Sequence, residues 1–322
     1  MPVVDGHSIT ITHPDKVLFP DDGITKGELA DYYLQIADRM LPHVRERPLH
    51  MNRFPNGIGG FVIQQKRVPE SFPDWIDRIT VNMTGGTITH AMINNAATLV
   101  YLANYNMITA HVWASRKEAI ERPDQLIFDL DPGSDDFTVV RTTAMKVRAM
   151  LEEMNLVPIV KTTGSRGLHV IAPITVGPTF EEVHLFADSV AQRLAASDPE
   201  HLTTEFLKDS RQGRLFLDVN RNAYAQTIVA PYAVRARRGA PVATPVTWSV
   251  VERSDLRPDG VTLRTVWDWL DNRKDPWQEI EANRRPLPAL KDSQRPDRSG
   301  RRRGTTKEQR ARRSATASSS TH

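Results

Sequence analysis

Apolar and polar residues alternate or recur at helical spacing along most of the chain, and these patterns predict both strands and helices. The capping box Thr25–Glu28 opens a predicted helix that ends near residue 42, with Tyr33, Ile36 and Met40 on one face. The same patterns predict helices over 94–107, 137–154, 179–194 and 261–271, and strands over 7–12, 51–60, 61–68, 108–113, 126–131, 157–161, 168–174 and 214–219.

Two aspartates lie at the end of the predicted strand Leu126–Asp131, and Pro-Gly follows them as a turn. Side chains alternate across a strand, so Asp129 and Asp131 share one face. Two carboxylates this close favour a nearby cation, and oxygen ligands favour Mg²⁺ or Mn²⁺, which commonly serve phosphoryl transfer. The alternative is a solvated strand end in which Asp-Pro-Gly is only a turn.

Further candidate residues lie at the ends of other predicted elements. The loop 162–167 offers backbone N–H groups, Ser165 and Arg166 and is followed by His169, all suited to phosphate oxygens, although the same loop fits a glycine-containing hairpin turn. Asp218 ends another strand and completes a metal site if the sheet brings it to the first two aspartates. His111, on the predicted strand 108–113, has a structural role as its simpler interpretation.

Lys26 lies in the first turn of the helix after Thr25, where free amides and the helix dipole favour an anion. On composition alone, Lys16 and Lys26 fit solvated lysines equally well.

Composition places the chain among ordinary globular proteins: of 322 residues, 39% are hydrophobic and 25% charged. This length suits one large domain or two lobes. No apolar run approaches the roughly 18 residues of a membrane span, and the N-terminus lacks a signal-peptide core. The chain has no cysteine, which excludes disulfides and thiolate metal sites and fits a cytosolic protein.

Positive charge is concentrated at the C-terminus. Residues 284–322 contain 12 Lys or Arg and 3 Asp or Glu, a net of +9, whereas the whole chain carries +3, so residues 1–283 carry −6. The pI near 9.1 is therefore no evidence that the body binds nucleic acid. Few apolar residues follow Pro286, which predicts a disordered basic tail over 286–322. Its arginines suit non-specific phosphate contacts, or solubility alone.

Three of these motifs together resemble the signatures of archaeo-eukaryotic primases. They are the Asp-x-Asp strand Leu126–Asp131, then Gly167-Leu-His169, and finally Leu217-Asp218, in the same order and spacing. The match is more specific to the primase–polymerase domain of bacterial ligase D, over roughly residues 5–280. The stretches that carry it are His13–Pro20, His111–Trp113, Phe128–Gly133, Thr163–Val170 and Ala230–Arg235.

The resemblance implies an α/β fold of the archaeo-eukaryotic primase type, with a catalytic sheet, a smaller accessory lobe and a disordered basic tail. The two-lobed domain would cover residues 1–285. Because neither a ligase nor a nuclease domain follows in this sequence, the resemblance implies a stand-alone member of the family.

Site residues follow position by position from the resemblance. Asp129, Asp131 and Asp218 would bind two Mn²⁺ or Mg²⁺ ions that activate a primer 3′-hydroxyl and hold the triphosphate of an NTP or dNTP. Ser165, Arg166, Gly167, His169 and Arg235 match triphosphate contacts, and His111 matches a nucleotide-pocket position. Contacts to DNA are implied for Lys16 and Lys26 at a 5′-phosphate, Arg211 near the primer terminus, and Arg53.

The implied function is DNA repair by short nucleotide addition at 5′-phosphorylated gaps or ends, with a preference for ribonucleotides. The implied partners are a separate ATP-dependent DNA ligase and Ku, and the implied protein is a cytoplasmic monomer at the bacterial nucleoid. Two departures from the family pattern concern the DNA end. His13 replaces a usual Asn, and Ile63-Gln64 replace paired aromatics that stack on template bases.

Two other classes of function compete with this interpretation. A phosphatase with a nucleophilic Asp expects Thr or Val where Gly133 stands, which argues against it. A non-catalytic module that binds DNA ends predicts the loss of a metal carboxylate, but all three are present.

Overall fold

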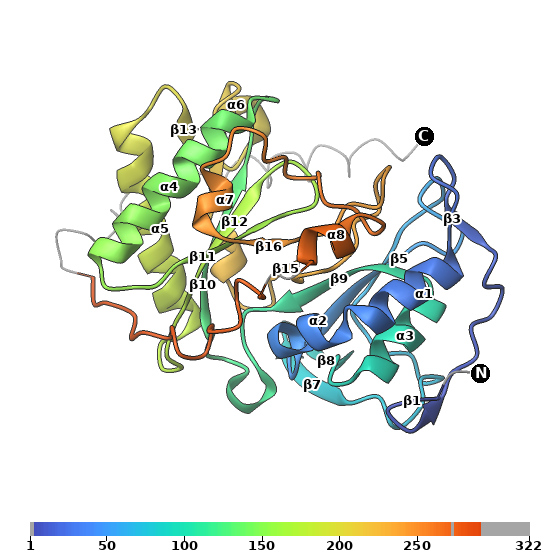
Figure 1. Ribbon diagram of the computed structural model, residues 1–322. Coiled ribbons are helices and arrows are strands. Elements are labelled where there is room, and N and C mark those ends of the chain that lie inside the picture. Colours follow the sequence, from blue (N-terminus) through green and yellow to red (C-terminus); the bar gives the residue numbers. More distant parts are fainter. Residues whose placement is uncertain (1–2, 272–273, 291–322) are drawn as a thin grey trace, which may run out of the picture. The chain divides into compact units, whose positions relative to one another are not determined.

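Two β-sheets form the framework of the protein in a computed structural model that describes residues 3–271 and 274–290 (Figure 1). The larger sheet has six strands in the order β13-β14-β10-β12-β11-β16. Their bounds are β10 Gln125–Asp131, β11 Ile159–Thr162, β12 Leu168–Pro173, β13 Leu202–Thr203, β14 Leu215–Asp218 and β16 Pro245–Val246. All neighbours are antiparallel except β13 and β14, which are parallel.

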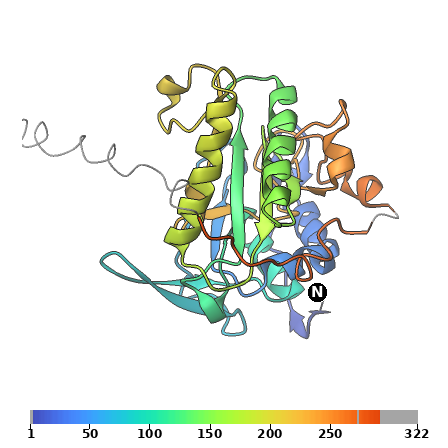
Figure 2. The ribbon, with the colours of Figure 1, turned by 90° about the vertical axis from the view of Figure 1, so that its left-hand side faces the viewer.

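Two long helices cover one face of this sheet: α4 (Phe137–Glu153) and α5 (Phe180–Ser197). Figure 2 shows them side by side in front of the sheet. The inward stripes predicted from spacing are buried, and the predicted capping box at Thr179–Glu182 is present at the start of α5. Burial of these stripes leaves the other face of the sheet to carry the candidate chemistry.

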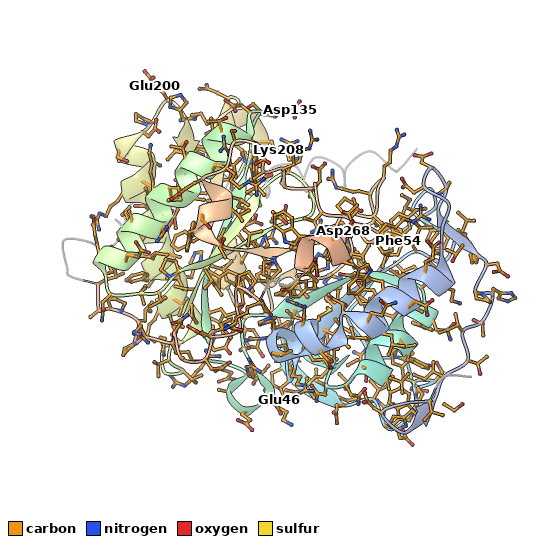
Figure 3. The ribbon with its side chains drawn as sticks, in the orientation of Figure 1. Glu46, Phe54, Asp135, Glu200, Lys208 and Asp268 are labelled. Carbon is orange, nitrogen blue, oxygen red and sulfur yellow. The ribbon has the colours of Figure 1, made fainter. Side chains whose placement is uncertain are left out.

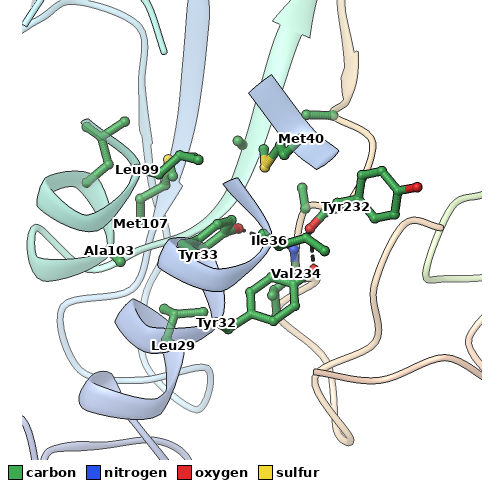
Figure 4. Close-up of a cluster of buried hydrophobic side chains, with 14 of the residues drawn as sticks. Leu29, Tyr32, Tyr33, Ile36, Met40, Leu99, Ala103, Met107, Tyr232 and Val234 are labelled. Carbon is green, nitrogen blue, oxygen red and sulfur yellow. Dashed lines mark hydrogen bonds between the residues drawn. The ribbon is translucent and has the colours of Figure 1, made fainter. Parts of the chain in front are cut away.

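The smaller sheet has four strands in the order β15-β9-β5-β6, all antiparallel. Their bounds are β5 Leu49–Arg53, β6 Ile63–Gln65, β9 Met107–Trp113 and β15 Thr227–Val229, and the associated helices are α1 Lys26–Gln35, α2 Ala37–Val44 and α3 Ala96–Asn104. Tyrosines join this helical layer to its surroundings. The hydroxyl of Tyr32 donates to the Tyr232 carbonyl (Figure 4), and that of Tyr33 donates to the Ile108 carbonyl.

The uncovered face of the large sheet packs against the small sheet. Ile127, Ile171 and Ile159 are register partners on β10, β12 and β11, and they form one apolar cluster with Ala114 and Ile228 from the region of β9 and β15. Trp277 closes the cluster by donating its indole N–H to a backbone carbonyl of β11. The next residues along this face of the sheet include the aspartates, which therefore lie directly beside an apolar core.

Short elements complete the described chain. They are β1 Val3–Val4, β2 His7–Ser8, β3 Val17–Phe19, β4 Ile24–Thr25, β7 Arg78–Met83, β8 Gly86–Ala91, α6 Lys208–Arg211, α7 Trp248–Val251 and α8 Val266–Leu270, with 3₁₀ turns at Lys117–Ala119 and Asn220–Asn222. The predicted tail lies mostly outside the described residues; only 286–290 belong to the described part, and they form neither helix nor strand.

The strands predicted over 51–60 and 61–68 are shorter in the structure, where only β5 and β6 form. Three other predicted elements differ from the structure for identifiable reasons. The helix predicted over 25–42 is divided at Ile36, whose ψ of −7° departs from the helical value near −42°. Of the strand predicted over 7–12 only β2 forms, because the Asn104 amide takes the backbone groups of Thr10 and Thr12.

The helix predicted over 261–271 is also shorter, because it starts only at Val266. Thr262 and Thr265 accept hydrogen bonds from each other's backbone N–H, which holds the preceding residues in a turn.

Candidate active site

The three predicted metal ligands lie on one face of the six-stranded sheet. Asp129 and Asp218 are register partners on the antiparallel strands β10 and β14, and Asp131 lies two residues beyond Asp129 on β10. Directly opposed residues direct their side chains to the same face, with Cβ atoms about 4.5–5.5 Å apart. Strand alternation predicted that Asp129 and Asp131 share a face, and the register of β14 against β10 places Asp218 on the same face.

Arginines balance the charge of these carboxylates. Arg221 places Nε 3.2 Å from Asp129 Oδ2 and Nη2 3.5 Å from Asp218 Oδ2, and Arg211 donates to Asp131 Oδ2 over 3.1 Å. Burial opposes ionisation of Asp129, but His169 and Arg221 hold its pKa below the usual range. Burial raises the pKa of Asp218, Arg221 counteracts this, and the charge of Asp129 adds to the rise. Each carboxylate on this face therefore has an arginine partner.

This donor set suits a divalent cation. Its members are carboxylate oxygens on one face of a sheet, the ligand type that hard divalent cations prefer. Within residues 3–271 and 274–290, no three acidic or histidine side chains already converge as a metal cage. Arg221 bridges Asp129 and Asp218, and Arg211 contacts Asp131, so the carboxylates that would hold a cation have arginine partners in this structure.

The loop between β11 and β12 is a hairpin turn and also a wall of the site. Thr163 accepts the Gly167 N–H through Oγ1 and donates its own backbone N–H to the Gly167 carbonyl. A Cβ at Gly167 would lie 2.0 Å from the Leu130 carbonyl oxygen, so only glycine lets the turn approach β10 this closely. Gly164, at φ +62°, leaves 2.7 Å between a Cβ and the Arg235 side chain. The loop is therefore a glycine-containing hairpin turn and at the same time lines the candidate site.

The predicted nucleotide residues surround one cavity of about 450 Å³. It is lined by Asp129, Asp131, Asp218, Ser165, Arg166, Gly167, His169, Arg235 and His111. His169 Nε2 lies 3.3 Å from Asp129 Oδ1, and burial, aided by Lys161, lowers the pKa of His169 to about 4. Burial also lowers the pKa of Arg235 to about 10, followed by the effect of Arg237. Cationic and neutral nitrogen donors therefore flank the carboxylates.

The four-stranded sheet supplies a neutral wall, of which only His111 was predicted from the sequence as a site residue. We use the term neutral wall for His50 and Asn52 of β5, Gln64 of β6 and His111 of β9. His50 Nε2, Asn52 Oδ1 and His111 Nδ1 are buried, and none has a hydrogen-bond partner among the described residues. The alternating His-Met-Asn on β5 was the available signal, because it directs two polar side chains to the same face.

Other cavity residues missed from the sequence are cationic. Arg221 lies three residues after Asp218, and Lys208 and Arg237 also line the cavity. Figure 3 shows Lys208 and Asp135 at the same end of the six-stranded sheet, where β10 ends and β14 begins. The sequence alone does not indicate which of its many lysines and arginines will line a cavity at the edge of a sheet.

The predicted DNA-contacting residues lie apart from the lining of this cavity, and Arg211 joins it only through Asp131. The Nζ atom of Lys26 donates to Thr12 over 2.9 Å, and burial, followed by the charge of Lys16, lowers the pKa of Lys26. Lys16 donates to the Pro55 carbonyl.

Arg53, the remaining predicted DNA contact, packs its guanidinium 3.5 Å above the Tyr105 ring centre and donates to Gln65. Lys16 and Lys26 thus form a close cationic pair, whereas Arg53 already has protein partners.

Comparison with known proteins identifies the family. The model of the LigD primase-polymerase domain matches residues 25–277. The multifunctional non-homologous end joining protein LigD of Mycolicibacterium smegmatis is 34% identical over 278 residues, which are 85% of this chain and 36% of that protein. The bifunctional LigD of Bacillus subtilis is 28% identical over 286 residues, 88% of this chain and 46% of that protein. The chain thus spans about a third to a half of these relatives.

A solved structure agrees with these sequence matches. The polymerase domain of Mycobacterium tuberculosis ligase D in complex with DNA matches with a TM-score of 0.82 and 32% identity, covering 86% of this chain and 99% of that one. In the described part of the chain, no helix has the length and apolarity needed to cross a membrane. The chain belongs to the LigD primase-polymerase domain family, whose members are metal-dependent nucleotidyltransferases.

Proposed function

We propose that this protein adds nucleotides to primer 3′ ends at 5′-phosphorylated gaps or breaks in DNA. The observation that carries the proposal is the cavity in which three aspartates face a cationic loop. A site with carboxylates for metal ions beside donors for phosphate oxygens suits in-line phosphoryl transfer, which depends on positioning and charge neutralisation more than on covalent chemistry.

Asp129, Asp131 and Asp218 are proposed to hold two Mn²⁺ or Mg²⁺ ions. When bound, such ions activate a hydroxyl nucleophile and neutralise charge on the triphosphate. The protein contributes rigid placement, because both Asp129 and Asp218 lie within sheet strands and beside the dry isoleucine cluster. Asp131 is the mobile member in this proposal, since its side chain points to Arg211 and lies nearer to solvent.

Ser165, Arg166, His169 and Arg235 are proposed to bind the triphosphate of an incoming NTP or dNTP, with Gly167 allowing close approach of the backbone. Charge-assisted hydrogen bonds to phosphate oxygens are stronger than neutral ones. The low pKa of His169 keeps its ring neutral near pH 7, so a proton on Nε2 lets it donate without adding charge. His111 is proposed to contact the nucleoside part.

Lys16 and Lys26 are proposed to bind the 5′-phosphate at the far side of a gap. Burial, followed by the charge of Lys16, lowers the pKa of Lys26, and a phosphate anion would offset the repulsion between the two lysines. The first N–H groups of α1 already donate within the protein, to the Lys16 and Pro14 carbonyls and to Thr25 Oγ1, so the lysine side chains would supply the contacts to the phosphate. Arg211 is proposed to approach the primer terminus after leaving Asp131, and Arg53 to contact DNA while it keeps its stack on Tyr105.

The proposed setting is DNA repair at chromosomal breaks or gaps, with a preference for ribonucleotides. We propose an ATP-dependent DNA ligase and Ku as partners, a monomeric protein, and a division into residues 1–285 as the primase–polymerase domain and 286–322 as a basic tail. The similarity to non-homologous end joining proteins motivates this setting.

Extension of a fluorescent primer across a one-nucleotide gap tests the proposal. With Mn²⁺ and ribonucleotides, the protein should fill a gap that carries a 5′-phosphate faster than the same gap with a 5′-hydroxyl. The Lys16→Ala, Lys26→Ala double variant should remove this difference. DNA binding without any extension would instead support a non-catalytic module that binds DNA ends.

A further inference from the structure

A buried lysine lies beside the site, on the six-stranded sheet. Lys161, on β11, has 0% of its surface exposed, and its amine has no hydrogen-bond partner in the described structure. Burial of an unpaired amine destabilises the folded protein in comparison with an apolar side chain of similar size. Burial, then the nearby Arg235, lowers the pKa of Lys161, and only Asp129 opposes them. This residue is unfavourable for folding.

The sheet register places Lys161 next to His169. Asp218, Asp129, His169 and Lys161 are consecutive register partners across β14, β10, β12 and β11, so their side chains share one face. His169 directs Nε2 toward Asp129, and its other ring nitrogen, Nδ1, is buried without a partner. The unpartnered amine and the unpartnered ring nitrogen thus belong to directly opposed residues.

We propose that Lys161 is a positioning residue for nucleotide binding that acts through His169. The amine donates an N–H to Nδ1 when a nucleotide is bound, so the ring proton stays on Nε2. That proton then points at a phosphate oxygen and no longer at Asp129. The inference rests on the proposed function, because it assumes a triphosphate beside His169.

The two tautomers of a neutral imidazole explain why a donor at Nδ1 matters. A neutral ring has one N–H donor and one acceptor nitrogen, and the partner of one nitrogen determines the role of the other. Without a donor at Nδ1 the proton can occupy that nitrogen, and Nε2 would then present a lone pair to an anionic phosphate. Lys161 removes this wrong tautomer while staying out of contact with the substrate.

Two readouts in Lys161→Met test the role. Without nucleotide, the variant should melt about 2 °C or more above the parent protein, because an unpaired buried amine is gone. With ATP and Mg²⁺, the dissociation constant measured by calorimetry should rise about tenfold. Lys161→Gln retains an N–H donor and should recover most of the affinity. In a His169→Ala background, Lys161→Met should have no further effect on ATP binding.

Lys146→Met is the matched control, since Lys146 pairs with Asp198 on the helical side of the sheet. It should leave ATP affinity unchanged and should not raise the melting temperature. Unchanged ATP affinity or a lower melting temperature in Lys161→Met would overturn the role of Lys161 alone. Failure of the parent protein to bind ATP would overturn the proposed function as well.

Discussion

The two walls of the cavity differ in charge and in how their polar atoms are satisfied. On the six-stranded sheet, Asp129, Asp131 and Asp218 are charged and are each paired with an arginine. On the neutral wall, His50 and Asn52 carry buried polar atoms without partners. On the six-stranded sheet, bound cations would replace the arginines as partners of the carboxylates. On the neutral wall, the unpartnered polar atoms would form hydrogen bonds with a ligand. Changes on the charged wall should therefore alter rate, and changes on the neutral wall should alter selectivity.

The largest effect is expected at the centre of the charged wall. Asp129→Asn keeps the shape of the side chain but removes the charge beside Asp218. Nucleotide addition should fall by about 100- to 1,000-fold, because a preorganised electrostatic contact is lost. Single-turnover extension measures this, with gapped-DNA binding by anisotropy as the control. If extension stays within threefold of the parent protein, Asp129 is not a metal ligand.

A smaller loss is expected at Arg235, which faces the cavity beside Gly164. Arg235→Ala should raise the nucleotide KM about 10- to 100-fold, because a hydrogen bond to an ionised phosphate contributes about 1.5–3 kcal/mol. Arg238→Ala is the matched control, since Arg238 is an exposed arginine on the same segment. Equal KM values for the two variants would remove Arg235 from the phosphate site.

On the neutral wall, the expected change is in the preference between ATP and dATP. Asn52→Leu removes the unpartnered Oδ1 atom while keeping the number and branching of the side-chain heavy atoms. The ratio of kcat/KM for ATP to that for dATP should change about two- to fivefold, while the rate with the better substrate stays within twofold. Competition between the two nucleotides measures this ratio directly. A loss of rate without a change of ratio would erase the distinction between the walls.

The smallest expected effect concerns acid stability. Burial, followed by the charge of Lys66, lowers the pKa of His50 to about 4, compared with about 6.5 in an unfolded chain. Protons therefore bind the unfolded chain more readily. The stability that this group contributes is complete above about pH 6.5 and declines as the pH falls toward 4.

In His50→Gln the melting temperature should consequently decrease less between about pH 7 and pH 5 than in the parent protein. Scanning calorimetry over this range provides the comparison. Equal decreases in the two proteins would show that the pKa of His50 is the same in the folded and unfolded states.

Local patterns predicted much of this site, and long-range pairing supplied the rest. The period of a strand placed Asp129 and Asp131 together, and the capping boxes at Thr25 and Thr179 are present as predicted. Sequence could not place Asp218 opposite Asp129, because the register of β14 depends on packing across the whole sheet. Lys161 lay within a correctly predicted strand, yet nothing in a sequence distinguishes a buried lysine from a solvated one.

The secondary-structure predictions that proved too long failed for a related reason. At Asn104 and at the Thr262–Thr265 pair, side chains replaced backbone partners and ended elements whose apolar spacing continued. Such substitutions depend on the side chains that tertiary structure brings near.

Binding of Mn²⁺ tests the central claim most directly, because it precedes every proposed step. Electron paramagnetic resonance can titrate free Mn²⁺ in the presence of the protein and ATP. Asp218→Asn should weaken Mn²⁺ binding at least about tenfold, because one of three charged oxygen ligands is lost. Asp135→Asn, in the exposed loop after β10, should bind as the parent protein does. Equal Mn²⁺ affinity in the two variants would contradict the assignment of the three aspartates.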